Sequence, residues 1–464
     1  MFDKQIYKQR REKLRGKLKG GVALILGNTD VPMNYADNAY RFRQDSNFLY
    51  FFGLDQQNLA GVIDLESGED ILFGDDFTLD DIVWMGPQPT LAERAGKAGV
   101  ERTQEFGKLH DLLAQVMKAG RKIHFLPPYR GENMILLEKL LGIKPDQQQA
   151  KSSADLIRAV VALRCVKDEG EVREIEKAVD TTALMHTTAM KMAYPGVYEY
   201  EIAGVVEGIA LSGGGRLAYP LILSIHGETL HNHSHHNKLR EGRMVIMDGG
   251  AESEMHYAAD ITRTFPVGGK FSQRQRDIYE IVLKAKQEAT RAIKPGIPFR
   301  DIHMLSAGVI AEGLSSLGIM KGDTRQAVEQ GAHALFMPHG LGHMMGLDVH
   351  DMEDLGEDYV GYDDEIKRSD IFGTKALRFG RKLEPGFVLT VEPGIYFIPE
   401  LVDRWEQEGR FREFINYEKV RTYLDFGGAR LEDNILVTDD GFRVLGRPIP
   451  DSPDDVEKMM EAGR

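Results

Sequence analysis

The stretch Met247-Asp-Gly-Gly-Ala-Glu-Ser-Glu-Met-His-Tyr-Ala-Ala-Asp-Ile-Thr-Arg-Thr-Phe-Pro266 decides the fold. It continues a short apolar run, Met244–Met247, which is typical of a buried strand. Apolar and polar residues alternate again from Tyr257 to Thr262, so we expect two antiparallel strands around a Gly-rich turn. Such strands hold Asp248 and Asp260 close together, at the edge of an apolar sheet.

Two carboxylates in an apolar place repel each other and resist ionising unless a cation compensates them. The pair therefore suggests a metal site. An alternative is a surface hairpin in which Asp248 and Asp260 serve only the chemistry of a turn. The aspartates alone favour the surface hairpin, and residues further along the chain overturn this interpretation.

The segment from Pro338 to Asp351 carries His339, His343 and His350 among several glycines. Each glycine costs about 1 kcal/mol against alanine in a helix, so a regular helix is not expected here. The glycines suit a backbone that passes close to another part of the molecule. The histidines are either structural residues or ligands.

Two further carboxylates stand at the ends of predicted strands. The apolar run Phe387–Val391 leads directly into Glu392, and Pro393 then forces a turn. Glu432 begins another β-rich run, two residues after Arg430. Oxygen ligands with one imidazole suit Mn, Fe, Co or Zn, and four carboxylate charges would be cancelled by two divalent ions.

These segments resemble the dinuclear "pita-bread" metallopeptidases, and among them the proline-specific branch of aminopeptidase P and prolidase. The phrases that carry the resemblance are Asp260-Ile-Thr-Arg-Thr-Phe-Pro266, His339-Gly-Leu-Gly-His343, Val391-Glu-Pro-Gly394 and Arg430-Leu-Glu432. The resemblance implies an α/β N-terminal domain and an α+β pita-bread catalytic domain with a curved antiparallel sheet. The spacing from Asp248 to Asp260 is one residue longer than is usual in the family, which a β-bulge can absorb.

The resemblance also implies the site. The metal ligands it implies, for two divalent ions per chain that we expect to be Mn²⁺, are Asp248, Asp260, His343, Glu392 and Glu432. Glu392 is the expected proton acceptor, and His339, His350 and His231 are expected to contact the substrate and stabilise charge. Arg378 resembles the arginine with which prolidases bind the substrate carboxylate, with an ordinary surface arginine as the alternative, and Arg430 is expected to orient a ligand and contact substrate.

The expected reaction is hydrolysis of the Xaa-Pro bond, releasing the N-terminal residue from peptides with proline second. The nearest alternative is a prolidase acting on Xaa-Pro dipeptides, favoured by Arg378 and by the long segment between Glu392 and Glu432. A methionine aminopeptidase is disfavoured by the large N-terminal domain. A non-catalytic binding module on the same fold is disfavoured because all five ligand positions are filled.

Length and composition agree with this interpretation. A chain of 464 residues is expected to form two domains, predicted here as residues 1–160 and 161–464. The net charge of −14 argues against a nucleic-acid partner, and no apolar run is long enough for a membrane span or a signal peptide. With one cysteine, Cys165, we expect a cytoplasmic protein. The resemblance implies a homodimer or homotetramer.

Periodicity predicts the elements of both domains. We expect strands at 22–26, 47–52, 60–63, 70–73 and 123–126, and helices at 4–19, 109–117, 134–141, 156–164, 168–194, 199–211, 272–292 and 299–318. Residues 231–236 include four histidines. The group is either a second metal-binding site or a solvated loop, and we favour the loop. The carboxylate pairs Asp248/Asp260 and Glu392/Glu432, on two strand pairs, form a two-fold echo, and the resemblance implies helices from two related halves.

Overall fold

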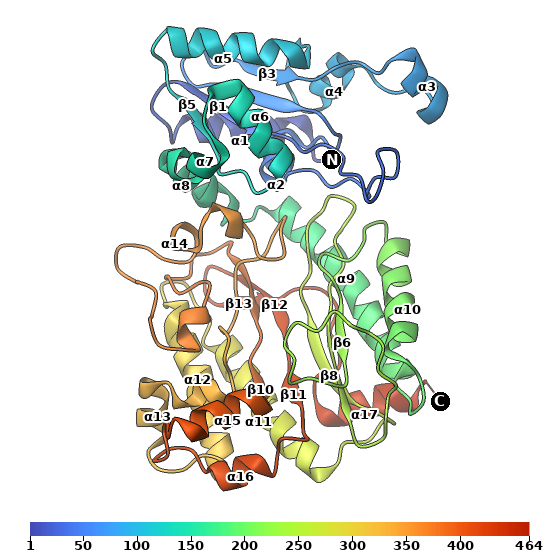
Figure 1. The fold of residues 1–464 in the computed structure, drawn as a ribbon, viewed down its shortest axis with the longest axis vertical. Coiled ribbons are helices and arrows are strands. Elements are labelled where there is room, and N and C mark those ends of the chain that lie inside the picture. The colour runs from blue at the N-terminus through green and yellow to red at the C-terminus, as the bar shows by residue number, and fades with distance from the viewer. Residues whose placement is uncertain (464) are drawn as a thin grey trace. The chain divides into compact units, whose positions relative to one another are not determined.

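The computed structural model describes residues 1–463 and divides into two compact units (Figure 1). The first consists of Met1–Arg164 together with Met352–Tyr359, and the second of the remaining residues from Cys165 onward. The predicted boundary at residue 160 falls inside a helix, Ala154–Arg164. The division into 1–160 and 161–464 stays a prediction. The return of residues 352–359 to the first unit has no signal in the sequence.

The first unit is an α/β domain, as predicted. Its mixed sheet has the strand order β4-β3-β2-β1-β5, with β1 antiparallel to β2 and parallel to β5. Apolar residues of α5 and α6, including Leu113 and Leu137, pack with Leu24, Val62 and Phe73 of the sheet in one buried cluster. The elements are α1 Lys4–Arg15, β1 Val22–Leu26, α2 Ser46–Phe52, β2 Ala60–Asp64, β3 Asp70–Phe73, α3 Leu79–Met85, α4 Leu91–Lys97, β4 Arg102–Gln104, α5 Leu109–Lys118, β5 Ile123–Phe125, α6 Gly131–Leu141, α7 Pro145–Lys151 and α8 Ala154–Arg164.

One predicted strand is wrong. Residues 47–52 belong to the helix α2, which Asp45 caps by accepting a hydrogen bond from the Phe48 amide and which ends at Gly53 in the left-handed region. Its aromatic side chains are buried on every side, and Phe48 stacks on Phe52 one turn later at 5.0 Å between ring centroids. A short run that is apolar throughout carries no periodicity, so the sequence cannot separate a buried helix from a strand.

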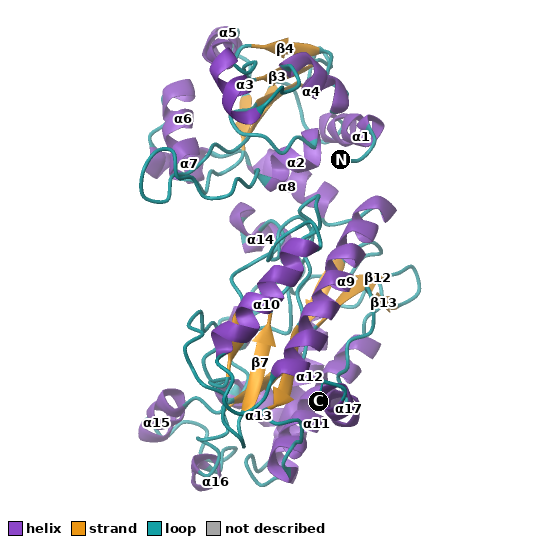
Figure 2. Ribbon diagram, turned by 90° about the vertical axis from the view of Figure 1, so that its right-hand side faces the viewer, coloured by secondary structure: helices purple, strands orange, loops and turns teal. Residues whose placement is uncertain are grey.

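The second unit contains two sets of paired antiparallel strands, here called the first and second ribbon, with a helix pair beside each. In Figure 2 α9 and α10 cover one face of the sheet that contains β7, and α11 packs against β9, β10 and β11. The elements are α9 Glu169–Met192, α10 Glu199–Ser212, β6 Ile222–Ser224, β7 Met244–Asp248, β8 Thr262–Pro266, α11 Gln273–Arg291, α12 Phe299–Ser316, α13 Thr324–Gln330, α14 Glu357–Val360 (mostly in the first unit), β9 Val388–Val391, β10 Gly394–Tyr396, α15 Pro399–Gln407, α16 Tyr417–Arg421, β11 Gly428–Arg430, β12 Asp433–Val437, β13 Phe442–Val444 and α17 Pro453–Glu461.

The first ribbon pairs β7 with β8 as predicted, but its turn is not at the glycines. The ladder continues through Gly249 and Gly250, and the chain reverses at residues 254–256, where His256 has φ 66°. Gly250 is needed for close approach, because a Cβ there would lie 1.8 Å from the Ala259 carbonyl oxygen. The pairing is unbroken from Met244 to the turn. The additional residue therefore lies in a three-residue turn, and no bulge separates the two aspartates.

The second ribbon has one register over two short ladders. β9 pairs with β12 and β10 with β11, and Val391 lies opposite Asp433 while Gly394 lies opposite Arg430. The break between the ladders falls at Glu392 and Glu432, which the common register places opposite each other. The two ribbons meet where the Glu432 amide donates to the Thr262 carbonyl oxygen at 3.1 Å.

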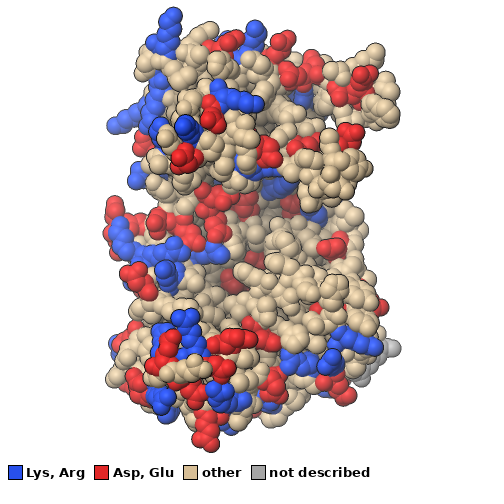
Figure 3. All heavy atoms as spheres, viewed as in Figure 1, with Lys and Arg blue, Asp and Glu red and all other residues tan. Residues whose placement is uncertain are grey.

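Among residues 1–463, the helices are too short or too polar to cross a lipid bilayer. On the face drawn in Figure 3, acidic and basic side chains are mixed over both units.

Two buried histidines predict how stability responds to acid. Burial lowers the pKa of His303, on α12, to about 3 and that of His333 to about 4. Above the unfolded pKa of about 6.5, both histidines are neutral in the folded and in the unfolded chain. As the pH falls below this value, they bind protons in the unfolded chain before they do so in the folded protein. Each therefore removes about 1.4 kcal/mol of stability per pH unit below 6.5 until its folded pKa is reached.

We expect His303→Leu to flatten the fall in the thermal unfolding midpoint of the second unit between pH 6.5 and 4.5. Calorimetry of parent and variant measures this slope. The control is His236→Gln, at an exposed position, which should keep the parental slope. Equal slopes for His303→Leu and the parent would contradict the assignment.

Candidate metal centre

The two ribbons deliver two pairs of carboxylates to one place. Asp248 ends β7, and Asp260 stands two residues before β8 on the partner strand. Glu392 follows β9, and Glu432 precedes β12 on the opposite strand. Glu392 and Glu432 stand at the break between the two ladders of the second ribbon, whereas Asp248 and Asp260 lie within the continuous pairing of the first.

The histidine segment runs along β9 in extended form. The Thr390 amide donates to the His343 carbonyl oxygen at 3.0 Å, and the Glu392 amide donates to the Leu341 carbonyl oxygen at 2.8 Å. A Cβ on Gly342 would lie 2.1 Å from the Thr390 carbonyl oxygen, so this glycine permits the close approach that the sequence predicted. The segment thereby brings His343 beside the carboxylates.

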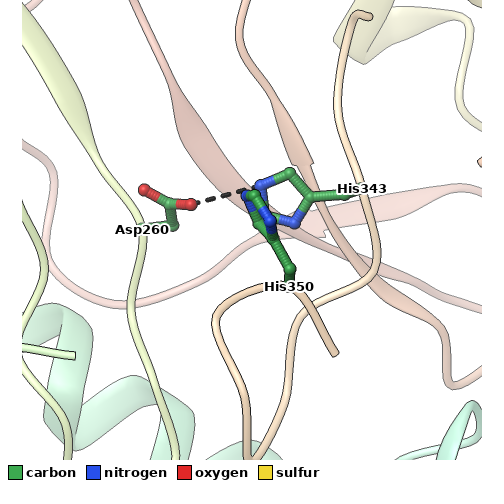
Figure 4. A group of neighbouring side chains, drawn as sticks. All are labelled: Asp260, His343 and His350. Atoms are coloured by element: carbon green, nitrogen blue, oxygen red, sulfur yellow. Dashed lines mark ion pairs between the residues drawn. The ribbon is translucent and has the colours of Figure 1, made fainter. Parts of the chain in front are cut away.

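His343 lies between carboxylates from both ribbons. Its Nε2 is 3.2 Å from Asp260 Oδ2 and 3.8 Å from Glu392 Oε1. Its Nδ1 is 3.0 Å from the Met344 carbonyl oxygen, which leaves Nε2 directed at the carboxylates. Figure 4 shows His350 beside it, with 4.1 Å between the ring centroids.

The donor atoms fit metal ions. Three overlapping groups have ligand atoms within 4.8 Å of one another, and Asp260, His343 and Glu432 each belong to two of them. The groups are Asp260 with His343 and His350, His343 with Glu392 and Glu432, and Asp248 with Asp260 and Glu432. Buried oxygen donors with an imidazole are the donor set that Mn, Fe, Co and Zn accept.

The electrostatics also favour a cation. Burial raises the pKa of Glu392 to about 7, with the charges of Asp260 and Asp248 acting in the same direction, and burial raises the pKa of Glu432 well above its usual range. Burial raises the pKa of Asp248 too. Asp260 differs: burial acts to raise its pKa, but the hydrogen bond and charge of His343 lower it. Most of these carboxyls resist ionising until positive charge is brought among them.

Arg430 connects the centre to the surrounding side chains. Its Nη2 donates to Asp248 Oδ2 at 2.6 Å, and its Nη1 donates to the Tyr396 hydroxyl at 2.7 Å. His339 Nδ1 donates to the Gly340 carbonyl oxygen at 2.8 Å, so its Nε2, 3.0 Å from the Tyr396 hydroxyl, is the accepting nitrogen. Burial and the charge of Arg430 lower the pKa of His339 to about 3, which keeps this ring neutral.

Several supporting residues have no signal in the spacing that predicted the candidate ligands. The Tyr219 hydroxyl lies 2.6 Å from Asp248 Oδ1 and 2.5 Å from Asp260 Oδ1, and the Thr262 hydroxyl donates to Glu432 Oε2 at 2.7 Å. Asn434 holds the Asp260 backbone, accepting from its amide at 3.0 Å and donating to its carbonyl oxygen. The position of Asn434, two residues after Glu432, was the one available clue.

A cavity of about 490 Å³ opens onto the carboxylates. Every site residue predicted from the sequence lines it, namely His231, Asp248, Asp260, His339, His343, His350, Arg378, Glu392, Arg430 and Glu432. Tyr219, Pro220, Ile222, Leu230 and Val349 add an apolar wall. Of the other histidines at 233–236, His233 lines the cavity, while His235 Nε2 lies 3.1 Å from the Leu221 carbonyl oxygen. Among residues 1–463, the groups with metal-ligand spacing do not include 231–236.

Known proteins resemble this chain over its whole length. Residues 173–439 match metallopeptidase family M24, and residues 7–124 match the aminopeptidase P N-terminal domain. The Xaa-Pro aminopeptidase of Escherichia coli (strain K12) is 32% identical over 100% of this chain and 99% of its own. The human Xaa-Pro dipeptidase is 30% identical over 95% of this chain and 89% of its own.

Solved structures agree. Zinc-substituted E. coli aminopeptidase P in complex with product superposes with a TM-score of 0.82 at 30% identity, covering 100% of this chain and 99% of that one. Aminopeptidase PepP of Pseudomonas aeruginosa gives 0.81 at 26% identity, covering 100% and 99%. With its N-terminal domain of the aminopeptidase P type, the chain belongs to metallopeptidase family M24.

Proposed function

We propose that this protein is a metal-dependent Xaa-Pro aminopeptidase, which hydrolyses the bond between the N-terminal residue of a peptide and a following proline. The observation that carries the proposal is the set of four carboxylates, three of them buried, and His343, which line one cavity. Membership of family M24 and the likeness to the E. coli Xaa-Pro aminopeptidase over the full chain support the same activity.

The donor set supports two divalent ions, held by Asp248, Asp260, His343, Glu392 and Glu432. Four carboxylate charges match two dications, and carboxylates with one imidazole and no thiolate suit Mn²⁺. When bound, the ions supply Lewis acidity, which lowers the pKa of a water molecule towards neutrality and polarises the scissile carbonyl.

The protein's own side chains then handle substrate and protons. Glu392 lines the cavity with its side chain 19% exposed, where its carboxylate can accept a proton from the attacking water and return it to the leaving nitrogen. His350 and the neutral His339 are placed to contact the peptide and to stabilise charge at the reacting carbonyl. The apolar wall beside Pro220 and Ile222 offers a surface for the proline ring or the N-terminal side chain.

A prolidase is the second candidate, and Arg378 is the observation that favours it. Arg378 lines the same cavity as the candidate metal ligands, where a guanidinium can bind a free carboxylate that follows proline directly. The similarity to the human Xaa-Pro dipeptidase supports this alternative. We further propose a cytoplasmic location, because Cys165 is single and buried, and a homodimeric or homotetrameric assembly.

Protons should compete with metal for the site. Because burial raises the pKa of Glu392 to about 7, that carboxyl binds a proton below neutral pH and must release it to become a ligand. We expect the affinity of the stripped protein for Mn²⁺ to rise from pH 5.5 to 7.5, with protons released on binding. Titration calorimetry in buffers of different ionisation enthalpy counts them, and Glu392→Gln should release fewer. An affinity for Mn²⁺ that does not change over this pH range would contradict the proposed site.

Loss of a ligand should abolish turnover while the fold persists. We expect His343→Ala and Glu392→Gln each to lower kcat by about 10²–10⁴-fold, with the circular dichroism of the parent. Metal analysis of the parent should give two ions per chain, and each variant should hold fewer ions or hold them more weakly. The matched control is His235→Ala, outside the cavity lining. A fully active enzyme with one ion per chain would refute the paired-ion proposal.

Substrate length separates the two candidates. For an aminopeptidase, Xaa-Pro-Yaa tripeptides are cleaved, and Arg378→Ala changes their kcat/KM little because their carboxylate lies further on. For a prolidase, the same variant raises KM for Xaa-Pro by about 10–100-fold, the value of a lost charge-assisted hydrogen bond. We expect tripeptide cleavage together with appreciable dipeptide turnover. Cleavage of Xaa-Pro with no cleavage of any tripeptide would decide for the prolidase.

A further inference from the structure

A buried ion pair packs against the loop 344–351, which carries His350. Lys167 Nζ is 2.9 Å from Asp351 Oδ2, and each side chain is 1% exposed. Both residues belong to the catalytic unit. Removing two such charges from water costs several kcal/mol per ion, which the attraction between them only partly repays. A pair this buried is therefore weak support for stability, and it suggests a role in fixing one conformation.

The ion pair closes the loop 344–351. The Asp351 amide donates to the Met344 carbonyl oxygen at 2.9 Å, and this bond joins the two ends of the loop, here called its neck. Within the loop, Asp351 Oδ1 accepts from the Asp348 amide at 3.3 Å. Gly346 leaves room for the pair, because a Cβ there would lie 2.6 Å from Asp351 Oδ2 and 2.9 Å from Lys167 Cε. The loop is folded around the two charges.

The same loop carries His350 into the cavity. His350 directly precedes Asp351, and its ring lies 4.1 Å from that of His343, which directly precedes Met344. The two rings thus stand on either side of the neck that the Asp351 amide closes. One end of the neck is fixed independently, since the Met345 amide donates to the Val388 carbonyl oxygen of β9 at 3.0 Å. At the other end, next to His350, Asp351 contributes the amide bond to Met344 and the ion pair to Lys167.

We propose that Lys167 and Asp351 are positioning residues that hold His350 at its place in the cavity. For the reaction, the inference rests on the proposed function. Lys167 itself enters from α9's N-terminal side, where its amide donates to the Gly386 carbonyl oxygen at 2.8 Å, so its ammonium stands on a fixed backbone. Without that ammonium, the buried Asp351 carboxylate loses this ion pair, and a shift of Asp351 in response moves the adjacent His350.

A double-mutant cycle tests the proposal with Xaa-Pro-Yaa turnover in excess Mn²⁺. We expect Lys167→Met to lower kcat by about 10–100-fold, the effect of displacing a substrate-contacting group by an ångström or so. In a His350→Ala background the same change should lower kcat less than about 2-fold, because Lys167 acts through His350. Asp351→Asn, which keeps an acceptor oxygen, should retain more activity than Asp351→Ala. Equal losses in both backgrounds would overturn the proposal.

Two controls separate positioning from damage to the fold or metal site. Leu314→Ala, in the buried part of α12, removes stability without touching the loop and should keep kcat at temperatures where it is folded. Mn²⁺ content and affinity of Lys167→Met, by metal analysis and calorimetry, should equal those of the parent. A weakened metal site in Lys167→Met would overturn the proposal, because the pair would then act on the ligands and not on His350.

The last readout does not depend on activity. The imidazole carbon–proton NMR signal of His350 is identified by its absence in His350→Ala. Lys167→Met should shift that signal and leave the signal of His110, in the first unit, in place. A parent that cleaves no Xaa-Pro peptide would refute the proposed function alone, and the NMR result would then decide the positioning role. An unmoved His350 signal would overturn it.

Discussion

Mutual repulsion among four clustered carboxylates is the constraint on which the catalytic unit depends. Asp248, Asp260, Glu392 and Glu432 lie where burial opposes ionisation, and the guanidinium of Arg430 pairs with only one of them, Asp248. Two ribbons must meet to create this arrangement. Every hydrogen bond between them, such as that from the Glu432 amide to Thr262, therefore works against an electrostatic cost that cations remove.

The side chains around the carboxylates divide into two kinds. Arg430, Tyr396 and His339 form a continuous set of hydrogen bonds from Asp248 to the cavity wall, so a change in charge at Asp248 is felt at the His339 ring. Asn434 and Thr262 instead fix the backbone or one oxygen of a ligand. The first kind can transmit a change in charge, whereas the second kind limits movement.

Much of this was predictable, for physical reasons. Carboxylates after apolar runs and glycines around His343 left a local pattern, because strand ends and close approaches demand particular residues. The strand at 47–52 was wrong because an entirely apolar run has no period, and α2 owes its form to its Asp45 cap and its packing. Tyr219 and Lys167 act on partners distant in sequence, so no spacing could reveal them.

The return of residues 352–359 to the first unit has a consequence for biosynthesis. Chains emerge from the ribosome N-terminus first, and domains commonly fold as they appear. Here the first unit lacks a segment until residue 359 of 464 has been made, long after residue 164 has left the exit tunnel. Until then the first unit lacks residues 352–359. A translational pause or a chaperone that acts between the synthesis of residues 164 and 359 would therefore affect both units at once.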